Sequence, residues 1–128
     1  MRVLLDTHTL LWFALDDPLL SRPAHAVIVD PANVKYVSPA SWWEIAIKMS
    51  VGKYTLTVPH DVFFDTAITA NGFLVLNIEP RHTAALIGLP QPHKDPFDRL
   101  LIAQAIVEDL PIVSADAAFD AYPVRRIW

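Results

Sequence analysis

The sequence predicts an α/β fold, a three-layer sandwich in which a mostly parallel sheet lies between helices. Continuous apolar runs, such as "VLL", "FLVL" and "IVS", are typical of strands that are buried on both faces. Helical patterns separate these runs, and such alternation favours parallel strands joined by right-handed crossovers. The 128 residues fit one domain, 1–128, with enough length to bury a core.

Five segments have the composition of strands, because β-branched, aromatic and aliphatic residues dominate them and turn residues bound them. In chain order they are RVLLD (2–6), VKYVS (34–38), FLVLNI (73–78), PIVSAD (111–116) and VRRIW (124–128). We expect the last of these at an edge of the sheet.

Six segments are predicted as helices, with proline, capping residues and glycine at their ends. In chain order they are 7–17, 22–31, 39–53, 59–72, 80–89 and 96–110. Pro18 stops the first helix, Ser38 caps the third, and Asn71-Gly72 can end the fourth.

Composition excludes several classes of protein. There is no cysteine, so disulfides and thiolate metal sites are ruled out. No run approaches the roughly 18 apolar residues of a membrane span, and we expect a cytoplasmic protein that does not bind membranes. The net charge of −4 argues weakly against nucleic-acid binding. It is not decisive, since acids gathered around a metal ion would make the total negative.

Four acids from four separate segments are predicted to meet at one edge of the sheet. Asp6 ends the first strand, and Asp116 lies just past the strand "PIVS". Asp98 lies in the first turn of the helix that precedes that strand, and Glu44 lies one to two turns into the helix after "VKYVS". Sites in parallel sheets form at the carboxyl ends of the strands, so all four can face one crevice.

Each acid also has a purely structural interpretation. Asp95 is a good N-cap for a helix with Pro96 at its first position, and Asp98 can favour the helix dipole. Glu44 and Lys48 have the i, i+4 spacing of a surface ion pair. The other two acids can cap the turns that follow them.

The combination favours a metal site. Asp98 shares a helix face with Ile102 and Ala105, Asp6 follows a buried strand, and Glu44 is embedded in "SWWEIAI". Carboxylates in apolar surroundings are costly unless they are paired or bind a metal. With oxygen ligands and no cysteine, Mg²⁺ or Mn²⁺ is favoured over zinc.

The motifs "LLDTHTLLW", "SWWEIAIK", "HKDPFDRLLIAQA" and "IVSAD" together resemble those of PIN-domain ribonucleases. More closely, they resemble the VapC-type toxins of bacterial type II toxin–antitoxin pairs. The resemblance implies strand order 3-2-1-4-5 and an endoribonuclease that uses Mg²⁺, or Mn²⁺, to activate water against RNA phosphodiester bonds. It also implies a cognate antitoxin and a homodimer.

The resemblance assigns roles residue by residue. Asp6, Glu44, Asp98 and Asp116 match the acidic quartet that binds metal and carries catalysis. Three more residues match supporting positions. Asp95 is expected as a helix cap or a partner of a ligand, Ser114 as a hydrogen-bond donor to the first-strand aspartate, and Thr7 as a similar candidate.

Four cations flank the expected crevice and are candidates for contacts with RNA phosphates. They are Lys48, Lys53, Lys94 and Arg99. Ordinary solvated charge explains them equally well, and Arg99 can instead pair with an acid.

Three tryptophans are candidates for the antitoxin interface, namely Trp12, Trp42 and Trp43, with core packing as the alternative. Trp42 and Trp43 are adjacent, so they cannot both face the same core.

Two other functions stay open at this stage. One is a catalytically silent α/β binding module that uses the acidic crevice for a cation or a partner protein. The other is a phosphatase or DNA nuclease on a similar sheet. The sequence "DTH" after the first strand disfavours an aspartyl-phosphate enzyme, which would favour D-x-D there.

Overall fold

The structure is a computed structural model, and it describes residues 1–90 and 95–128. The described residues form five strands and six α-helices with one short 3₁₀ helix, η1. In order these are β1 (Arg2–Leu5), α1 (Thr7–Ala14), α2 (Arg22–Val29), β2 (Val34–Val37), α3 (Pro39–Ser50), α4 (His60–Ala70), β3 (Leu74–Val75), α5 (Pro80–Ile87), α6 (Pro96–Glu108), β4 (Ile112–Val113), η1 (Ala117–Ala121) and β5 (Arg126–Ile127).

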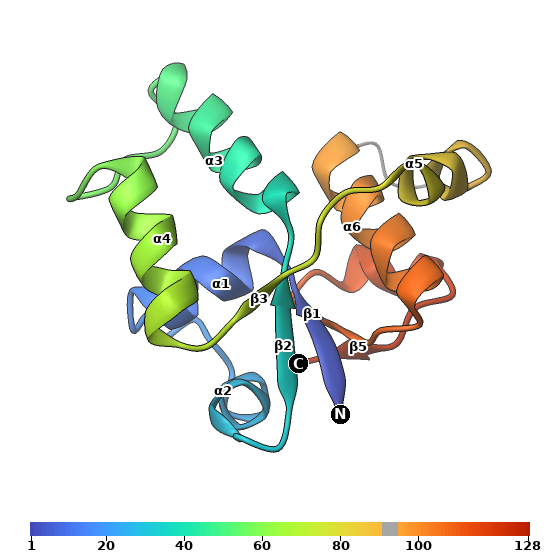
Figure 1. Ribbon diagram of the computed structural model, residues 1–128, viewed down its shortest axis with the longest axis horizontal. Coiled ribbons are helices and arrows are strands. Elements are labelled where there is room, and N and C mark those ends of the chain that lie inside the picture. Colours follow the sequence, from blue (N-terminus) through green and yellow to red (C-terminus); the bar gives the residue numbers. More distant parts are fainter. Residues whose placement is uncertain (91–94) are drawn as a thin grey trace.

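The strands form one sheet in the order β3-β2-β1-β4-β5, and every neighbouring pair is parallel. This confirms the predicted fold class and strand order, with β5 at an edge as expected. In Figure 1 the strands run upward from the N-terminus, and α1, α3 and α6 begin above their carboxyl ends. The sheet therefore gathers three helix N-termini at one edge.

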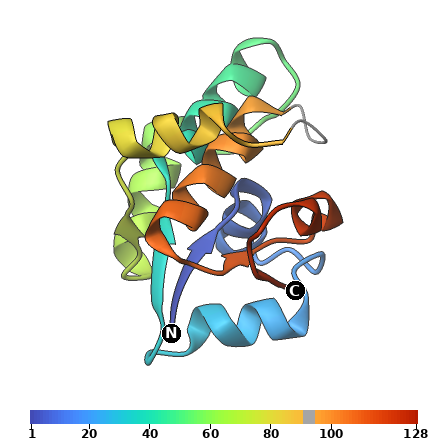
Figure 2. The ribbon, with the colours of Figure 1, turned by 90° about the vertical axis from the view of Figure 1, so that its right-hand side faces the viewer.

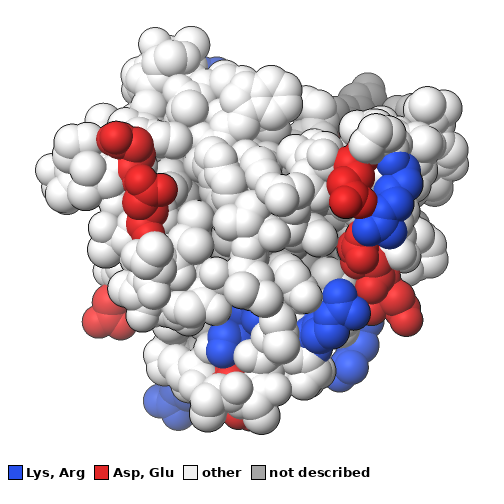
Figure 3. All heavy atoms as spheres, in the orientation of Figure 1, with Lys and Arg blue, Asp and Glu red and all other residues white. Residues whose placement is uncertain are grey.

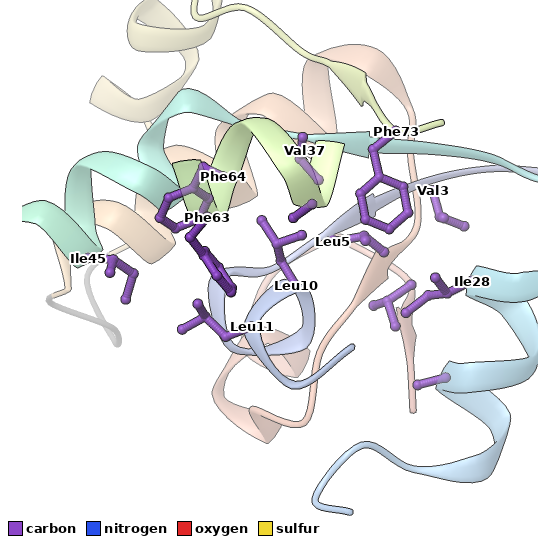
Figure 4. Packing of buried hydrophobic residues seen from close by; sticks show 13 residues of the cluster. Val3, Leu5, Leu10, Leu11, Ile28, Val37, Ile45, Phe63, Phe64 and Phe73 are labelled. Carbon is purple, nitrogen blue, oxygen red and sulfur yellow. The ribbon is translucent and has the colours of Figure 1, made fainter. Parts of the chain in front are cut away.

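Both faces of the sheet are buried along β1 and β4, as continuous apolar strands predict, whereas both residues of the edge strand β3 are exposed, unlike the buried strand expected for "FLVL". Along β1, Val3 and Leu5 belong to one core cluster and Leu4 to the other. The first cluster lies under α1, α2 and α4 and includes Phe63 and Phe64 (Figure 4). The second lies mainly under α5, α6 and η1, which cover the opposite face, as the turned view shows (Figure 2).

Side-chain caps fix where the three helices at this edge begin. The Asp6 carboxylate accepts a hydrogen bond from the backbone N–H of Thr9, and Ser38 caps α3. Asp95 caps α6 with Pro96 at the first position, as predicted. Each helix thus starts within one or two residues of a strand end or a loop at the carboxyl edge.

Several elements are shorter than expected. α1 ends at Ala14 rather than Asp17, because Asp16 takes a left-handed conformation with φ of 52°. β3 has two residues, since the carbonyls of Leu76 and Asn77 accept from the buried amide of Gln104 instead of a strand. In the part of the chain that the structure describes, no helix is long and apolar enough to cross a membrane.

Candidate active site

Asp6 and Asp116 are joined through Ser114 at the carboxyl ends of β1 and β4. The Ser114 hydroxyl donates to Asp6 Oδ2, and the backbone N–H of Asp116 donates to Ser114 Oγ over 3.0 Å. Asp6 Oδ1 accepts from the backbone N–H of Thr9 at 2.7 Å. Asp116 is exposed and caps η1 through the N–H of Ala118. Both aspartates therefore cap a helix while they lie at the same edge of the sheet.

Asp6 lies in surroundings that change its acidity. Burial raises the pKa of its carboxyl above the ordinary value of 3.8, although hydrogen bonds from Ser114 and Thr9 act in the opposite direction. Desolvation penalises the ionised form, because water can no longer solvate the charge. A cation beside Asp6 would remove that penalty.

Glu44 is the most strongly buried acid of the predicted quartet, with 3% of its surface exposed. Lys48 Nζ lies 2.6 Å from Glu44 Oε2, which confirms the i, i+4 ion pair. The other oxygen, Oε1, is buried and has no hydrogen-bond partner among residues 1–90 and 95–128. Such an unsatisfied carboxylate oxygen is costly in a folded protein and marks a position that a ligand can complete.

Two contacts tie α3 to the helices that carry the other acids. Thr7, next to Asp6, donates through Oγ1 to Ser41 Oγ over 3.0 Å, and Ser41 lies one turn before Glu44. On the other side, the Trp43 ring meets the Phe97 ring edge to face, with centroids 5.2 Å apart. Residues adjacent to the predicted ligands thus hold α1, α3 and α6 together.

Asp95 and Asp98 have different surroundings. Asp95 Oδ1 accepts from the backbone N–H groups of Phe97 and Asp98 at 2.9 and 3.1 Å, so this carboxylate is occupied as a cap. Asp98 is half-buried in the first turn of α6. Sharing a helix face with Ile102 and Ala105 does not distinguish Asp98, since every residue from 99 to 105 on α6 is buried, whichever face it lies on.

Burial of the Arg99 side chain disfavours its predicted contact with RNA phosphates, and its predicted pairing with an acid stays a prediction. Its side chain is buried, and its guanidinium donates to the carbonyls of Pro90, Leu86 and Leu89. It thereby anchors the end of α5 to α6. Lys53 is exposed, whereas Lys94 lies outside the described residues.

The adjacent tryptophans divide as predicted. Trp42 packs against Phe64 at the margin of the first core cluster. Trp43 is 58% exposed. Trp12 is half-buried between His8 and the C-terminal Trp128, with ring centroids 5.7 and 5.8 Å away.

A second acidic cluster, which sequence reasoning missed, lies between α5 and α6. Glu79, His82 and Glu108 bring three ligand atoms within 4.8 Å of one another, which the acids of the quartet do not. The backbone N–H of Glu79 donates to His82 Nδ1, so Nε2 carries the ring proton and donates to Glu108 over 2.9 Å. Arg81 pairs with both glutamates. Figure 3 shows acidic and basic side chains together on this side of the molecule.

The two clusters differ in how well they suit a divalent cation. In the α5–α6 cluster both imidazole nitrogens are engaged and one arginine already pairs with both carboxylates. The quartet supplies only oxygen donors, includes the unsatisfied Glu44 Oε1 and the desolvated Asp6, and lies at the strand ends. Oxygen donors of this kind suit Mg²⁺ or Mn²⁺, so the quartet fits the expected metal ion.

Comparison with known proteins places this fold in a family. The PIN domain family model matches residues 3–124, and the chain therefore belongs to the PIN domain family. The protein named Ribonuclease VapC22 from Mycobacterium tuberculosis (strain ATCC 25618 / H37Rv) is 30% identical over 115 residues, which cover 89% of this chain and 86% of that protein. The resemblance seen in the sequence motifs is confirmed.

Solved structures share the fold at lower identity. VapBC2 from Rickettsia felis, bound to a DNA fragment from its promoter, contains a chain with a TM-score of 0.70 and 15% identity, over 98% of this chain and 97% of that one. VapBC-1 from nontypeable Haemophilus influenzae gives a TM-score of 0.64 and 12% identity, over 98% and 96%. At these identities the likeness shows the fold alone.

Proposed function

We propose that this protein is a metal-dependent endoribonuclease and the toxin of a toxin–antitoxin pair that acts in the cytoplasm. The observation that carries the proposal is the buried Glu44 carboxylate, which has one oxygen without a partner at the edge where Asp6 and Asp116 are joined. Membership of the PIN domain family and similarity to a protein named as a ribonuclease support RNA as the substrate.

The proposed ligands of Mg²⁺, or of Mn²⁺, are Asp6, Glu44, Asp98 and Asp116. A bound divalent ion supplies Lewis-acid activation of water and of the scissile phosphate. The supporting residues have structural roles. Ser114 fixes the relative position of Asp6 and Asp116, Thr7 ties α1 to α3, and Asp95 fixes the start of α6.

Cations near the ligands have separate proposed roles. Lys48 holds Glu44 Oε2 by a 2.6 Å ion pair and is half exposed, so it can turn toward a phosphate once a metal ion occupies the carboxylate. Lys53, exposed just beyond α3, is proposed as a second phosphate contact.

The proposed protein partners are an antitoxin and a second copy of this chain. Solved VapBC structures with the same fold support an antitoxin, and Trp12 on α1 is our candidate anchor for it. Coexpression tests this directly. The antitoxin should relieve growth arrest and protect Trp12 from solvent, and unchanged protection would contradict this assignment.

The decisive experiment measures RNA cleavage by purified wild type, Asp98→Asn and Asp6→Asn, each with Mg²⁺, Mn²⁺ or EDTA. We expect cleavage by wild type only with metal, and loss of at least about 100-fold in both variants. Changes to groups around metal ligands typically cost about 10–100-fold, and ligand loss should exceed that. Asp65→Asn removes an exposed carboxylate on α4 and serves as the matched control.

Growth arrest on expression in cells should follow the same pattern across these variants. If wild type binds Mg²⁺ but cuts no RNA under any metal condition, the protein is instead a silent binding module. If Asp98→Asn and Asp6→Asn cut as well as wild type, the quartet is not the catalytic centre.

A further inference from the structure

Trp43 is the one Trp, Tyr or Phe side chain among the described residues that is mostly exposed to solvent. Its exposed fraction of 58% contrasts with that of its neighbour Trp42, which packs on Phe64. An exposed aromatic ring lacks the favourable free energy that such side chains normally gain when they are buried. The ring therefore needs an explanation other than core packing.

The Trp43 ring is held in place by Phe97 from the first turn of α6. Their centroids are 5.2 Å apart and the ring planes make an angle of 83°, the favourable edge-to-face arrangement. Only part of the indole is covered by this contact, since more than half of the residue remains exposed. The contact thus leaves an oriented aromatic surface open to a ligand.

This surface lies directly beside the proposed metal ligands. Trp43 immediately precedes Glu44 on α3, and Phe97 immediately precedes Asp98 on α6. Consecutive residues of an α-helix point about 100° apart, so the indole faces away from the buried Glu44 carboxylate, and a group bound on the indole lies to one side of whatever the two carboxylates bind. For an RNA bound through a phosphate at that centre, this group is a base flanking the phosphate.

Charge makes such a neutral contact useful. The chain has a net charge of −4, and the predicted quartet adds negative charge where a phosphate must approach. Of the two nearby cations, Arg99 donates to backbone carbonyls, and Lys48 pairs with Glu44 as long as no metal ion occupies that carboxylate. Stacking of a base on an aromatic ring adds affinity without a positive charge.

We infer that Trp43, oriented by Phe97, is a stacking surface for one unpaired RNA base beside the cleaved phosphodiester. The inference rests on the proposed ribonuclease function and adds a contact that selects single-stranded or splayed substrate. The rival occupant is a second protein, because Ile47 and Val51 continue an exposed apolar stripe along α3 from Trp43. Ile47→Ala is therefore the matched control.

The test combines changes at Trp43 with changes in the RNA substrate and compares kcat/KM for each single change and for both together. RNA that wild type cleaves is resynthesised with a single abasic nucleotide at each position around the cleaved bond. In wild type, one abasic position should lower kcat/KM about fivefold to a hundredfold, the range that removal of one stacking contact produces. In Trp43→Ala the intact substrate should suffer a similar loss, and the abasic change should add almost nothing. Trp43→Phe should keep part of the effect.

A second measurement avoids catalysis. In the Asp98→Asn background, single-stranded RNA should quench tryptophan fluorescence, and the additional change Trp43→Phe should remove most of the quenching. Ile47→Ala should leave both the kcat/KM comparison and the binding unchanged.

The outcomes separate the inference from the proposed function. An abasic penalty that persists undiminished in Trp43→Ala overturns the stacking role while RNA cleavage by wild type stands. Equal losses in Trp43→Ala and Ile47→Ala, with a change of mass in solution, overturn it in favour of a protein interface. No metal-dependent RNA cleavage by wild type overturns both.

Discussion

Two acidic clusters on this small domain look alike in composition and differ in what satisfies them. In the α5–α6 cluster, His82 and Arg81 supply donors to Glu79 and Glu108, and the imidazole uses both of its nitrogens. At the strand ends, a buried glutamate keeps an oxygen without a partner, and burial raises the pKa of Asp6. The cluster with the tighter spacing is therefore the one with less need of a ligand.

This difference teaches that proximity of ligand atoms is a weak sign of a metal site. A cluster whose polar groups are hydrogen-bonded and ion-paired with one another needs no metal ion, and its atoms are close because they bond to one another. In a cluster with unsatisfied buried carboxylates, a bound cation can offset the desolvation cost. We therefore interpret the α5–α6 cluster as structural and propose that the quartet binds the ion.

The largest effect expected from this comparison is on catalysis. Glu44→Gln should lower RNA cleavage by about 100-fold or more, because it removes a charged ligand from the quartet. Glu108→Gln is nearly isosteric, keeps an oxygen that can accept from His82, and should leave kcat/KM within about twofold of wild type. The measurement is cleavage of one RNA under saturating Mg²⁺. Equal losses in both variants would mean that the α5–α6 cluster also serves the reaction.

The second largest effect should be on the free energy of unfolding, and it should come from changes in the α5–α6 cluster. His82 is fully buried and joins the start of α5 to α6. His82→Ala should cost about 3 kcal/mol, since it creates a cavity and removes the partners of the Glu79 backbone N–H and of the Glu108 carboxylate. Urea unfolding measures this. Arg81→Ala, which removes an exposed arginine and its two ion pairs, should change the midpoint little. A small effect of His82→Ala would show that α5 is not held by this network.

Much of the fold followed from local rules, for reasons that particular residues make clear. Apolar strands with inward residues on both faces indicated a parallel sheet, and Val3, Leu4 and Leu5 divide between two cores as that rule requires. Asp95 and Pro96 gave the start of α6, because capping depends only on neighbouring backbone groups. Short stretches of sequence are enough to predict local interactions of this kind.

Contacts between distant segments were not predictable in the same way. Arg99 was expected at the crevice, yet it is buried against carbonyls at the end of α5. No sequence spacing links His82 to Glu108, which lies 26 residues away. The pair Trp42-Trp43 indicated that one ring is exposed, and only the packing of Trp42 on Phe64 decides which. Which of these contacts form depends on tertiary packing, and the local sequence pattern does not predict it.

The smallest expected effect is the contribution of Asp6 to the pH dependence of the free energy of unfolding. Its ordinary pKa is 3.8 and its pKa in the folded protein is higher, because of burial. Between these two values the native state binds more protons than the unfolded state, so this group makes the free energy of unfolding fall as pH rises. Above the folded pKa, the ionised carboxylate carries its full desolvation cost. Asp6→Asn should therefore be more stable than wild type at pH 7, and this difference should vanish below pH 3.8.

Mg²⁺ should reverse that order at pH 7. Binding at 100 times the Kd adds about 2.7 kcal/mol to the stability of wild type, and the Asn variant should gain far less. Thermal unfolding of both proteins with and without Mg²⁺ measures the effect, and Glu108→Gln, which leaves the quartet intact, should respond like wild type. An equal rise in Tm for Asp6→Asn and wild type would place the cation away from Asp6. Loss of the rise in Glu108→Gln alone would move the metal site to the α5–α6 cluster, because only that carboxylate would then be needed to hold the ion.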